Sequence, residues 1–361
     1  MPSVIKKIIL CAFALLWTLV AAETYLRVFA PEAMLPRFIE EGEHGIRRNI
    51  PGERYSHSSV EYRVDFSINR QGIRDPREFE KPKPEDVLRI LLLGDSFAMG
   101  YGVSYEDSVP ARLESALRDL YDRPVEVINL AVSGFGTAEE LIALETDGWS
   151  FEPDVVMVFW DWSDPRDNIR SQLYELTTAG LIPVNDTYLP AVAIRTWLFS
   201  FSSYRWIAEH SQFYNWIRDE VGRTTRAFLF TLNSMRASNF KMASDDSGKV
   251  TDANAIPRDI GLSLALLERI QDSCEDHGAG FFIAEVPTNP NPGVFKPSFP
   301  YEAMKKSGYA FDVIDPIPVF EQFRDSSDGG LIYWQKSAGH WTPLGTSAMA
   351  EAIADYLKTV R

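Results

Sequence analysis

A serine that directly follows an apolar run is the first candidate for chemistry in this chain. The run from Val87 to Leu93 is apolar apart from Arg89, and it ends at Gly94-Asp95-Ser96. A run of this length predicts a buried strand, and the turn then places Ser96 at the strand's carboxyl end. Ligands bind at that edge of an open parallel sheet, and a tight turn lifts a serine oxygen clear of the backbone. Ser96 is therefore a candidate nucleophile, and a cap of the following helix is its alternative role.

A serine nucleophile needs a base within hydrogen-bond reach and donors aimed at the developing oxyanion. The chain has five histidines. His340 alone lies in a loop directly before a predicted final helix, in the sequence Ser337-Ala338-Gly339-His340-Trp341-Thr342-Pro343. His340 is therefore the candidate base, and an ordinary loop histidine is the alternative.

Two segments resemble signature blocks of a known family. Gly94-Asp95-Ser96-Phe97 resembles the first block of the GDSL or SGNH hydrolases, and the segment around His340 resembles their last block. The resemblance extends from about Tyr62 to the C-terminus, with a gap in the middle. It implies a flavodoxin-like fold and a serine hydrolase acting on esters, with Ser96 as nucleophile and His340 as base.

The same resemblance implies the oxyanion donors. The backbone N–H groups of Ser96 and Gly134 match two of them, because Gly134 follows the second strand as the glycine of the family's second block does. The family's third donor is an asparagine after the next strand, and Ser163 stands in its place. A hydroxyl can donate a hydrogen bond, but it reaches less far than an amide.

The chain departs from the family at the group that orients the histidine. The family has an aspartate two or three residues earlier, where this chain has Ala338 and Ser337. A backbone carbonyl near Lys336 or Ser337, or a distant acid such as Asp328, remains as the orienting group. Losing one oxyanion donor costs about 100- to 1,000-fold in rate, and losing the orienting aspartate costs about 10,000-fold in serine proteases. A non-catalytic protein on the same fold therefore stays an alternative.

Three aspartates form a second pattern. Asp161, Asp164 and Asp167 are spaced by three and could form a cation site, but solvated loop acids are the commoner meaning of such spacing. The chain has no HExxH sequence, no paired cysteine motif and no GxGxxG loop. We therefore expect no metal and no cofactor.

Alternating strands and helices must position these residues. Apolar runs predict strands at Val87–Leu93, Val125–Val132, Asp154–Trp160, Gly280–Val286 and Phe311–Asp315, and periodic segments predict helices at 108–122, 137–148, 263–277 and 343–358. This alternation predicts a parallel sheet with right-handed crossovers. The expected fold class is α/β, a doubly wound parallel sheet of about five strands.

Two segments extend the core domain, which we expect at 87–361. Residues 31–86 form an N-terminal extension in which Tyr62 to Asn69 alternates as a half-exposed strand does. Arg70 to Asp75 is similar to the extension before the serine block in exported bacterial members of the family, and we expect it to form a flap over a sheet edge, with a direct role in the site as the alternative. Residues 169–257 form an insertion rich in aromatic residues. We expect one or two helices packed on the domain, or a lid that shapes the pocket, with a mobile loop from Lys241 to Ala255.

Residues 1–30 predict a signal peptide or a membrane anchor. Lys6 and Lys7 precede an uncharged apolar run from Ile8 to Ala22. The domain is therefore expected outside the cytoplasm, periplasmic or secreted, and bound to the inner membrane if the segment is retained. A formal net charge of -15 argues against nucleic acid or an anionic membrane surface as the main partner. Cys274 has no partner for an internal disulfide in a mature domain.

Three functions remain open from the sequence. The first is a serine hydrolase that cleaves carboxylic esters, with O-acyl groups on a carbohydrate or cell-envelope polymer as the substrate class that the resemblance implies. The second is an O-acyltransferase that passes the acyl group from Ser96 to a polysaccharide hydroxyl, for which a lid would exclude water. The third is a non-catalytic binding protein. Trp162, Trp334 and Trp341 would suit sugar rings, although a core or pocket wall is the commoner place for tryptophan.

Overall fold

The computed structural model describes residues 3–31, 33–42, 45–118, 120–185, 190–222, 224, 256–327, 330–337 and 339–360. The chain divides into two compact units. Unit 1 holds Met1–Pro36, His57–Val60 and Phe201–Ala255, and unit 2 holds Arg37–Ser56, Glu61–Ser200 and Ile256–Arg361. The loop expected from Lys241 to Ala255 lies outside the described residues.

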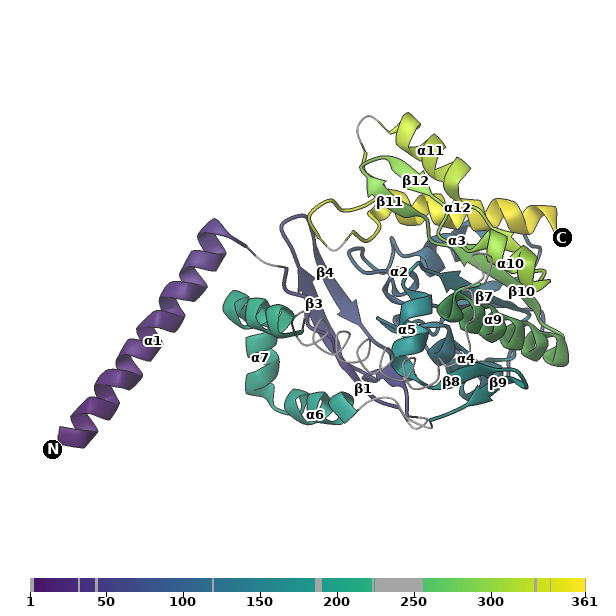
Figure 1. Ribbon diagram of the computed structural model, residues 1–361. Coiled ribbons are helices and arrows are strands. Elements are labelled where there is room, and N and C mark those ends of the chain that lie inside the picture. Colours follow the sequence, from purple (N-terminus) through teal and green to yellow (C-terminus); the bar gives the residue numbers. More distant parts are fainter. Residues whose placement is uncertain are drawn as a thin grey trace. The chain divides into compact units, whose positions relative to one another are not determined.

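A five-stranded parallel sheet forms the centre of unit 2 (Figure 1). In chain order its strands are β5 (Leu88–Leu93), β6 (Val125–Asn129), β7 (Val155–Trp160), β10 (Gly280–Glu285) and β13 (Val313–Ile314). Their spatial order is β13-β10-β7-β5-β6, the flavodoxin-like order. The chain therefore runs from β5 to β6 at one edge of the sheet and then crosses back to β7 on the other side of β5. The strand order thus reverses between β5 and β7. The predicted doubly wound α/β fold is confirmed.

Helices cover both faces of the sheet because helical crossovers join its parallel strands. On one face α3 (Val109–Arg118) packs on α12 (Pro343–Thr359). On the other face α9 (Arg258–His277) packs on α4 (Thr137–Thr146) and α5 (Asp164–Ser171). Further elements of this unit are α2 (Ser96–Met99), a 3-10 turn at Gly148–Phe151, α10 (Tyr301–Ser307), α11 (Ile317–Ser326) and the hairpin of β11 (Thr288–Asn291) with β12 (Val294–Lys296).

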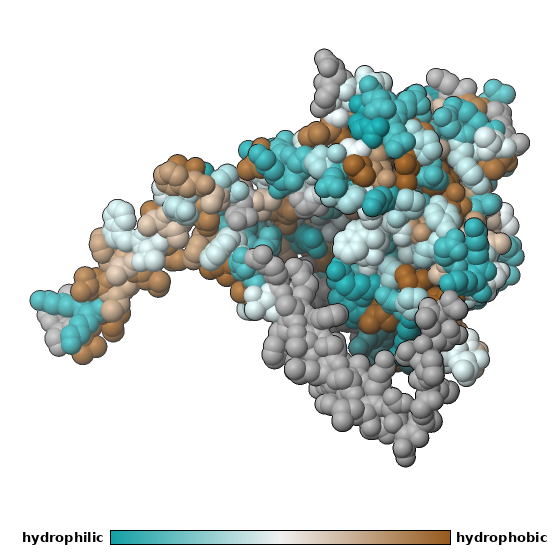
Figure 2. Space-filling model, turned by 45° about the horizontal axis from the view of Figure 1, so that its top comes forward, coloured by the Kyte–Doolittle hydropathy of each residue, from teal (hydrophilic) through white to brown (hydrophobic). Residues whose placement is uncertain are grey.

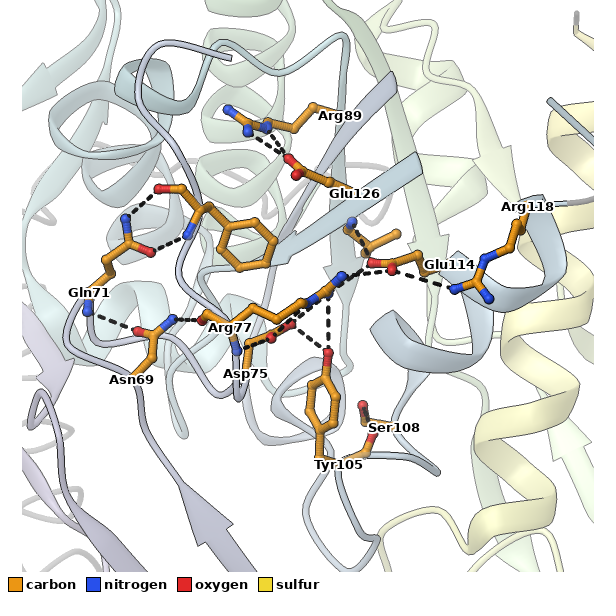
Figure 3. Close-up of polar contacts among 12 residues, drawn as sticks. Asn69, Gln71, Asp75, Arg77, Arg89, Tyr105, Ser108, Glu114, Arg118 and Glu126 are labelled. Carbon is orange, nitrogen blue, oxygen red and sulfur yellow. Dashed lines mark hydrogen bonds and ion pairs between the residues drawn. The ribbon is translucent and has the colours of Figure 1, made fainter. Parts of the chain in front are cut away.

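The central strands are buried along almost their whole length. Every residue of β5 is buried, as are the residues of β7 after Val155. Burial on both faces explains why these strands are continuous apolar runs in the sequence. Arg89 in β5 is the exception, and its guanidinium donates to Glu126 (2.6 Å; Figure 3). It also donates to the carbonyl of Phe151 (2.6 Å), so the buried charge is fully paired.

The second predicted strand is too long. It ends at Asn129 and not at Val132. The Asn129 side chain accepts from the N–H of Ala131 (3.0 Å), which turns the chain before the apolar run ends.

The N-terminal extension forms two hairpins. β1 (Ile39–Glu41) pairs with β2 (Arg47–Asn49), and β3 (Arg54–Ser58) pairs with β4 (Arg63–Ser67). Buried and exposed residues alternate along β4, so the half-exposed strand predicted there is confirmed.

Charged groups fix the end of the extension to the core (Figure 3). Arg77 donates to Asp75 (2.9 Å) and to Glu114 on α3 (2.8 Å), and the hydroxyl of Tyr105 also donates to Asp75 (2.5 Å). Asn69 closes the turn that precedes them by accepting from the N–H of Ile73 (3.0 Å). The chain that leads into β5 is therefore held by specific contacts on α3.

The aromatic insertion contains more elements than predicted. In unit 2 it begins with the hairpin of β8 (Tyr174–Thr177) with β9 (Gly180–Pro183), followed by α6 (Pro190–Phe199). In unit 1 it continues with α7 (Ser202–His210) and a helical stretch at 212–222. The predicted helices are present, and the lid remains a prediction.

α1 (Ser3–Phe29) in unit 1 is the N-terminal apolar helix expected from the sequence. Its stretch Val4–Phe29 is long and apolar enough to cross a membrane, and its most apolar window is not buried by the rest of the chain. Figure 2 shows apolar residues along the helix and polar ones at its N-terminal tip. These features fit a signal peptide or an anchor.

Candidate active site

Ser96 is the first residue of α2, directly after the turn that ends β5. Asp95 caps this helix by accepting from the N–H of Phe97 (2.8 Å). Gly94 has a φ of +154°, and a Cβ there would lie 2.7 Å from Ala98 Cβ and 3.0 Å from Phe159 Cβ. The bend that lifts half-buried Ser96 off the end of the strand therefore requires glycine.

The loop after β6 and the N-terminal extension both hold this turn. After β6, the N–H of Val132 donates to the carbonyl of Gly94 (3.2 Å). From the extension, buried Arg74 donates to three backbone carbonyls in the segment that follows Ser96. These are the carbonyls of Met99 (2.9 Å), Gly100 (2.6 Å) and Val103 (2.7 Å). The sequence predicts a flap in this region, with a direct role in the site as the alternative. Arg74 instead fixes the chain that carries Ser96.

The structure brings His340 and Ser96 together. His340 Nε2 lies 2.8 Å from Ser96 Oγ. The histidine sits in the loop before α12, where its carbonyl accepts from the N–H of Trp334 (2.8 Å). Its ring packs against Phe97 and Tyr101, with ring centroids 4.9 and 5.5 Å away. The two residues that the sequence singled out are therefore in hydrogen-bond contact.

The second ring nitrogen of His340 has no such contact. Nδ1 is buried and finds no hydrogen-bond partner among the residues that the structure describes. The carbonyl of Lys336 or Ser337, expected as an orienting group, does not accept from it, and Asp328 lies outside the described residues. Apart from the contact of Nε2 with Ser96, packing against aromatic rings orients the imidazole. Leaving a buried polar atom unpaired costs about 1–3 kcal/mol.

Burial and, to a smaller degree, the charge of Arg37 lower the pKa of His340 to about 4. The guanidinium of exposed Arg37 lies 6.0 Å from the ring of Tyr101, which itself packs on the histidine. At neutral pH the imidazole is therefore uncharged, which is the form that can accept a proton.

Gly134 and Ser163, the two further predicted oxyanion donors, follow the strands on either side of the strand that precedes Ser96. Gly134 follows β6 and Ser163 follows β7, and these are the two neighbours of β5 in the sheet. Gly134 has a φ of +82°, and a Cβ there would lie 2.7 Å from the guanidinium of Arg47. The Ser163 hydroxyl donates to Asp167 (3.4 Å), so its proton already has an acceptor. The arrangement fits two backbone donors better than it fits the hydroxyl.

A set of buried carboxyl groups adjoins the serine turn. Asp95, Glu140, Asp161 and Asp164 are all buried and close enough to one another to interact electrostatically. Burial raises the pKa of each, to about 8 for Asp95, and repulsion between neighbouring carboxylates adds to the rise. At neutral pH Asp95 therefore retains its proton for the most part, and ionisation of the other three carboxyl groups is disfavoured.

The prediction that Asp161, Asp164 and Asp167 are solvated loop acids is wrong, because their exposed fractions are 4%, 0% and 5%. The N–H of Ser163 donates to Asp161 (3.2 Å), and the N–H of Asp161 donates to Asp164 (3.1 Å). The acids thus shape the turn into α5, and Asp164 and Asp167, three residues apart, lie on the buried side of its first turn.

Metal binding has no support in this cluster. Within the described residues, no three His, Cys, Asp or Glu side chains are arranged to hold a metal ion. The expectation of a site without metal or cofactor stays a prediction.

The three tryptophans expected near the pocket differ in exposure. Trp341 is buried, and half-buried Trp334 donates from Nε1 to the carbonyl of Gly102 (3.1 Å). Trp162 is 57% exposed, with the guanidinium of Arg166 5.2 Å from its ring. Among the three, Trp162 has a ring available to a ligand.

Comparison with known proteins found no matching family model and no matching curated protein. Among solved structures, the chain is similar to TesA, with 12% identity and a TM-score of 0.38 over 76% of this chain and 99% of that one. It is also similar to a lipolytic protein of the G-D-S-L family from Desulfitobacterium hafniense DCB-2, with 13% identity and a TM-score of 0.37 over 74% of this chain and 98% of that one.

A further match is the psychrotrophic esterase EstA from Pseudoalteromonas sp., with 13% identity and a TM-score of 0.37 over 75% of this chain and 97% of that one. The chain is similar to these proteins, and its resemblance to the GDSL or SGNH hydrolases continues to rest on the residues around Ser96 and His340. At such identities the likeness concerns the fold, and the activity has to follow from the site itself.

Proposed function

We propose that this protein is a serine esterase that cleaves carboxylic O-acyl esters. The observation that carries the proposal is the 2.8 Å contact between Ser96 Oγ and His340 Nε2. It lies at the carboxyl end of β5, beside the point where the strand order reverses, which is where open α/β sheets bind ligands. An uncharged histidine in contact with a serine hydroxyl is the pairing that nucleophilic catalysis needs.

The proposed reaction has two halves. Neutral His340 accepts the proton of Ser96 as Oγ attacks the ester carbonyl carbon, and the N–H groups of Ser96 and Gly134 stabilise the oxyanion. His340 then gives the proton to the leaving alkoxide, which departs as an alcohol and leaves an acyl group on Ser96. Water repeats the sequence: it loses a proton to His340 and attacks the acyl carbon, the bond to Oγ breaks, and His340 returns the proton to Oγ as the carboxylic acid leaves.

Two further features, an exposed tryptophan and the apolar helix α1, support a substrate class and a location. Exposed Trp162 would suit the face of a sugar ring, which supports an O-acylated carbohydrate or cell-envelope polymer as substrate. The apolar helix α1 supports a place outside the cytoplasm, periplasmic or secreted.

A non-catalytic binding protein is the second candidate. Two observations favour it: the unpaired Nδ1 of His340, and the Ser163 hydroxyl that donates to Asp167 where the family has an asparagine. In this candidate Ser96 and His340 would bind a ligand without turning it over.

Hydrolysis of p-nitrophenyl esters from acetyl to octanoyl by the full chain in detergent separates the two candidates. We expect turnover that Ser96→Ala and His340→Gln each reduce at least 1,000-fold, since either change removes the attacking pair. Ser163→Ala is the matched control, and it should lower kcat less than tenfold because its hydroxyl is already engaged. Equal, trace activity in wild type and Ser96→Ala would support the binding protein.

A further inference from the structure

Unit 1 carries several large apolar side chains that the described chain leaves partly exposed. On α7 the exposed fractions of Trp206 and Ile207 are 62% and 40%, and on the stretch 212–222 those of Trp216 and Val221 are 39% and 58%. Large apolar side chains left exposed on neighbouring helices are candidates for contact with a partner. We call these two helices the aromatic pair.

If α1 spans a bilayer, its contacts with the aromatic pair give the depth of the pair in that bilayer. The 19 residues from Val4 to Ala22 rise about 29 Å at 1.5 Å per residue, which matches the hydrocarbon core of a bilayer. Within that run only Lys6 and Lys7 are charged, and both lie near the end, where long side chains reach the headgroups. Glu23 is therefore the first residue beyond the core on the opposite side.

Glu23 is also the residue that binds the aromatic pair. Its carboxylate accepts from the Ser211 hydroxyl (2.9 Å) and from the N–H groups of Gln212 (3.0 Å) and Phe213 (2.9 Å). It thereby caps the stretch 212–222 at its start. One turn later Arg27 donates to the carbonyl of His210, at the end of α7. The junction between the two helices is thus tied to the point where α1 leaves the membrane.

From these contacts we propose that the aromatic pair lies in the headgroup region of the bilayer, with Trp206 and Trp216 inserted among the lipids. Tryptophan is enriched at that depth because its ring is apolar and its N–H can donate to water or headgroups. A net charge of -15 gives no attraction to anionic lipid, so contact with a zwitterionic surface is the expected mode. The proposal does not depend on the esterase activity, and it requires that α1 be retained.

A depth measurement on the full chain in phosphatidylcholine nanodiscs tests this. The two cysteines, Cys11 and Cys274, are first replaced by serine and alanine, and single cysteines carrying a spin label are placed at Trp206 or Trp216. Leu15→Cys, in the middle of α1, marks the bilayer centre. We expect labels at both tryptophan positions to be more accessible to oxygen than to a water-soluble nickel chelate, at a depth between Leu15→Cys and free label in buffer. Accessibility equal to that of free label would overturn the proposal.

An unlabelled measurement guards against disturbance by the label. Brominated lipids quench the fluorescence of tryptophans that contact them. Trp17 in α1 should be quenched in the wild type and in the double variant Trp206→Phe with Trp216→Phe, and most of the remaining quenching should be absent from the double variant. Trp149→Phe, on a tryptophan stacked on His277 in unit 2, is the matched control. Unchanged quenching in the double variant contradicts the proposal. Mass spectrometry of protein isolated from membranes contradicts it as well if the N-terminus lies after Ala22, because α1 would then have been removed.

Discussion

His340 is held in place by aromatic rings, and the carboxylate that would usually orient such a base is absent among the described residues. Its contact with Phe97 and Tyr101 fixes the plane of the ring, while the unpaired Nδ1 leaves the choice of tautomer unassisted. Such a base is correctly placed to accept the Ser96 proton, but no hydrogen bond to Nδ1 stabilises its protonated form. At the residue scale, the proposed esterase should therefore be slow, and its reactivity should respond to small electrostatic changes near the ring.

The first such change is the loss of Arg37. Burial is the larger cause of the low pKa of His340 and the charge of Arg37 is the smaller, so Arg37→Ala should raise that pKa by the smaller part of the shift. The acidic limb of the pH–rate profile should move up by the same amount, because protonated His340 cannot accept a proton. Arg37→Lys keeps the charge and should leave the limb in place. An acidic limb that is identical in Arg37→Ala and wild type would show that the charge does not reach the imidazole.

The second change restores a carboxylate before the histidine. Ala338 stands two residues before His340, at a position where the resembled family has aspartate. Ala338→Asp should raise kcat at least tenfold at pH 7, with little change in KM, because an orienting carboxylate favours the tautomer that can accept the Ser96 proton. Ala338→Asn, of the same size without the charge, should give no such gain. A lower kcat in both variants would indicate that packing alone sets the orientation.

At the scale of elements, the turn from β5 to α2 determines where the serine lies. The sequence predicts this turn because a buried parallel strand is a continuous apolar run and a Gly-Asp-Ser sequence ends it. The same logic locates β7 and β10. It misses α5, because the segment Asp164–Ser171 is polar and becomes a helix through buried acids that only the tertiary structure reveals. Arg74 is missed for the same reason, since its three carbonyl partners are brought to it by folding.

The turn should not tolerate a side chain at Gly94. In Gly94→Ala the new Cβ would meet Ala98 and Phe159 at a backbone angle that alanine rarely adopts, and we expect a loss of about 3 kcal/mol or more in the free energy of unfolding. Gly52→Ala is the matched control, because Gly52 also has a positive φ (+77°) but has nothing within 4 Å of a Cβ. It should cost about 1 kcal/mol. Urea denaturation compares the two, and equal losses would mean that the contacts are not the cause.

At the scale of the whole molecule, the carboxyl cluster links stability to pH. Its pKa values in the folded state lie above those of the unfolded chain, so the unfolded chain releases these protons first as the pH rises. The stability that the cluster contributes is complete below about pH 4, near the unfolded pKa of an aspartate, and is lost as the pH rises toward the folded value of about 8 for Asp95.

We therefore expect Tm to fall between pH 5.5 and pH 8, as measured by thermal denaturation of the full chain in detergent. Asp164→Asn removes one buried titrating group and keeps its shape, so it should make Tm less dependent on pH over this range. Glu351→Gln, on an exposed residue of α12, should leave the dependence unchanged. A Tm that rises toward pH 8 would show that the cluster is ionised in the folded protein.

The central claim is that Ser96 is a nucleophile activated by His340. Reaction of the full chain with a fluorophosphonate, followed by intact mass and peptide mapping, tests it without knowledge of the substrate. We expect one added phosphonyl group, mapped to Ser96 and absent from Ser96→Ala, with a rate at least 100-fold lower in His340→Gln. No labelling of the wild type, or labelling of Ser96 at an unchanged rate in His340→Gln, would contradict it.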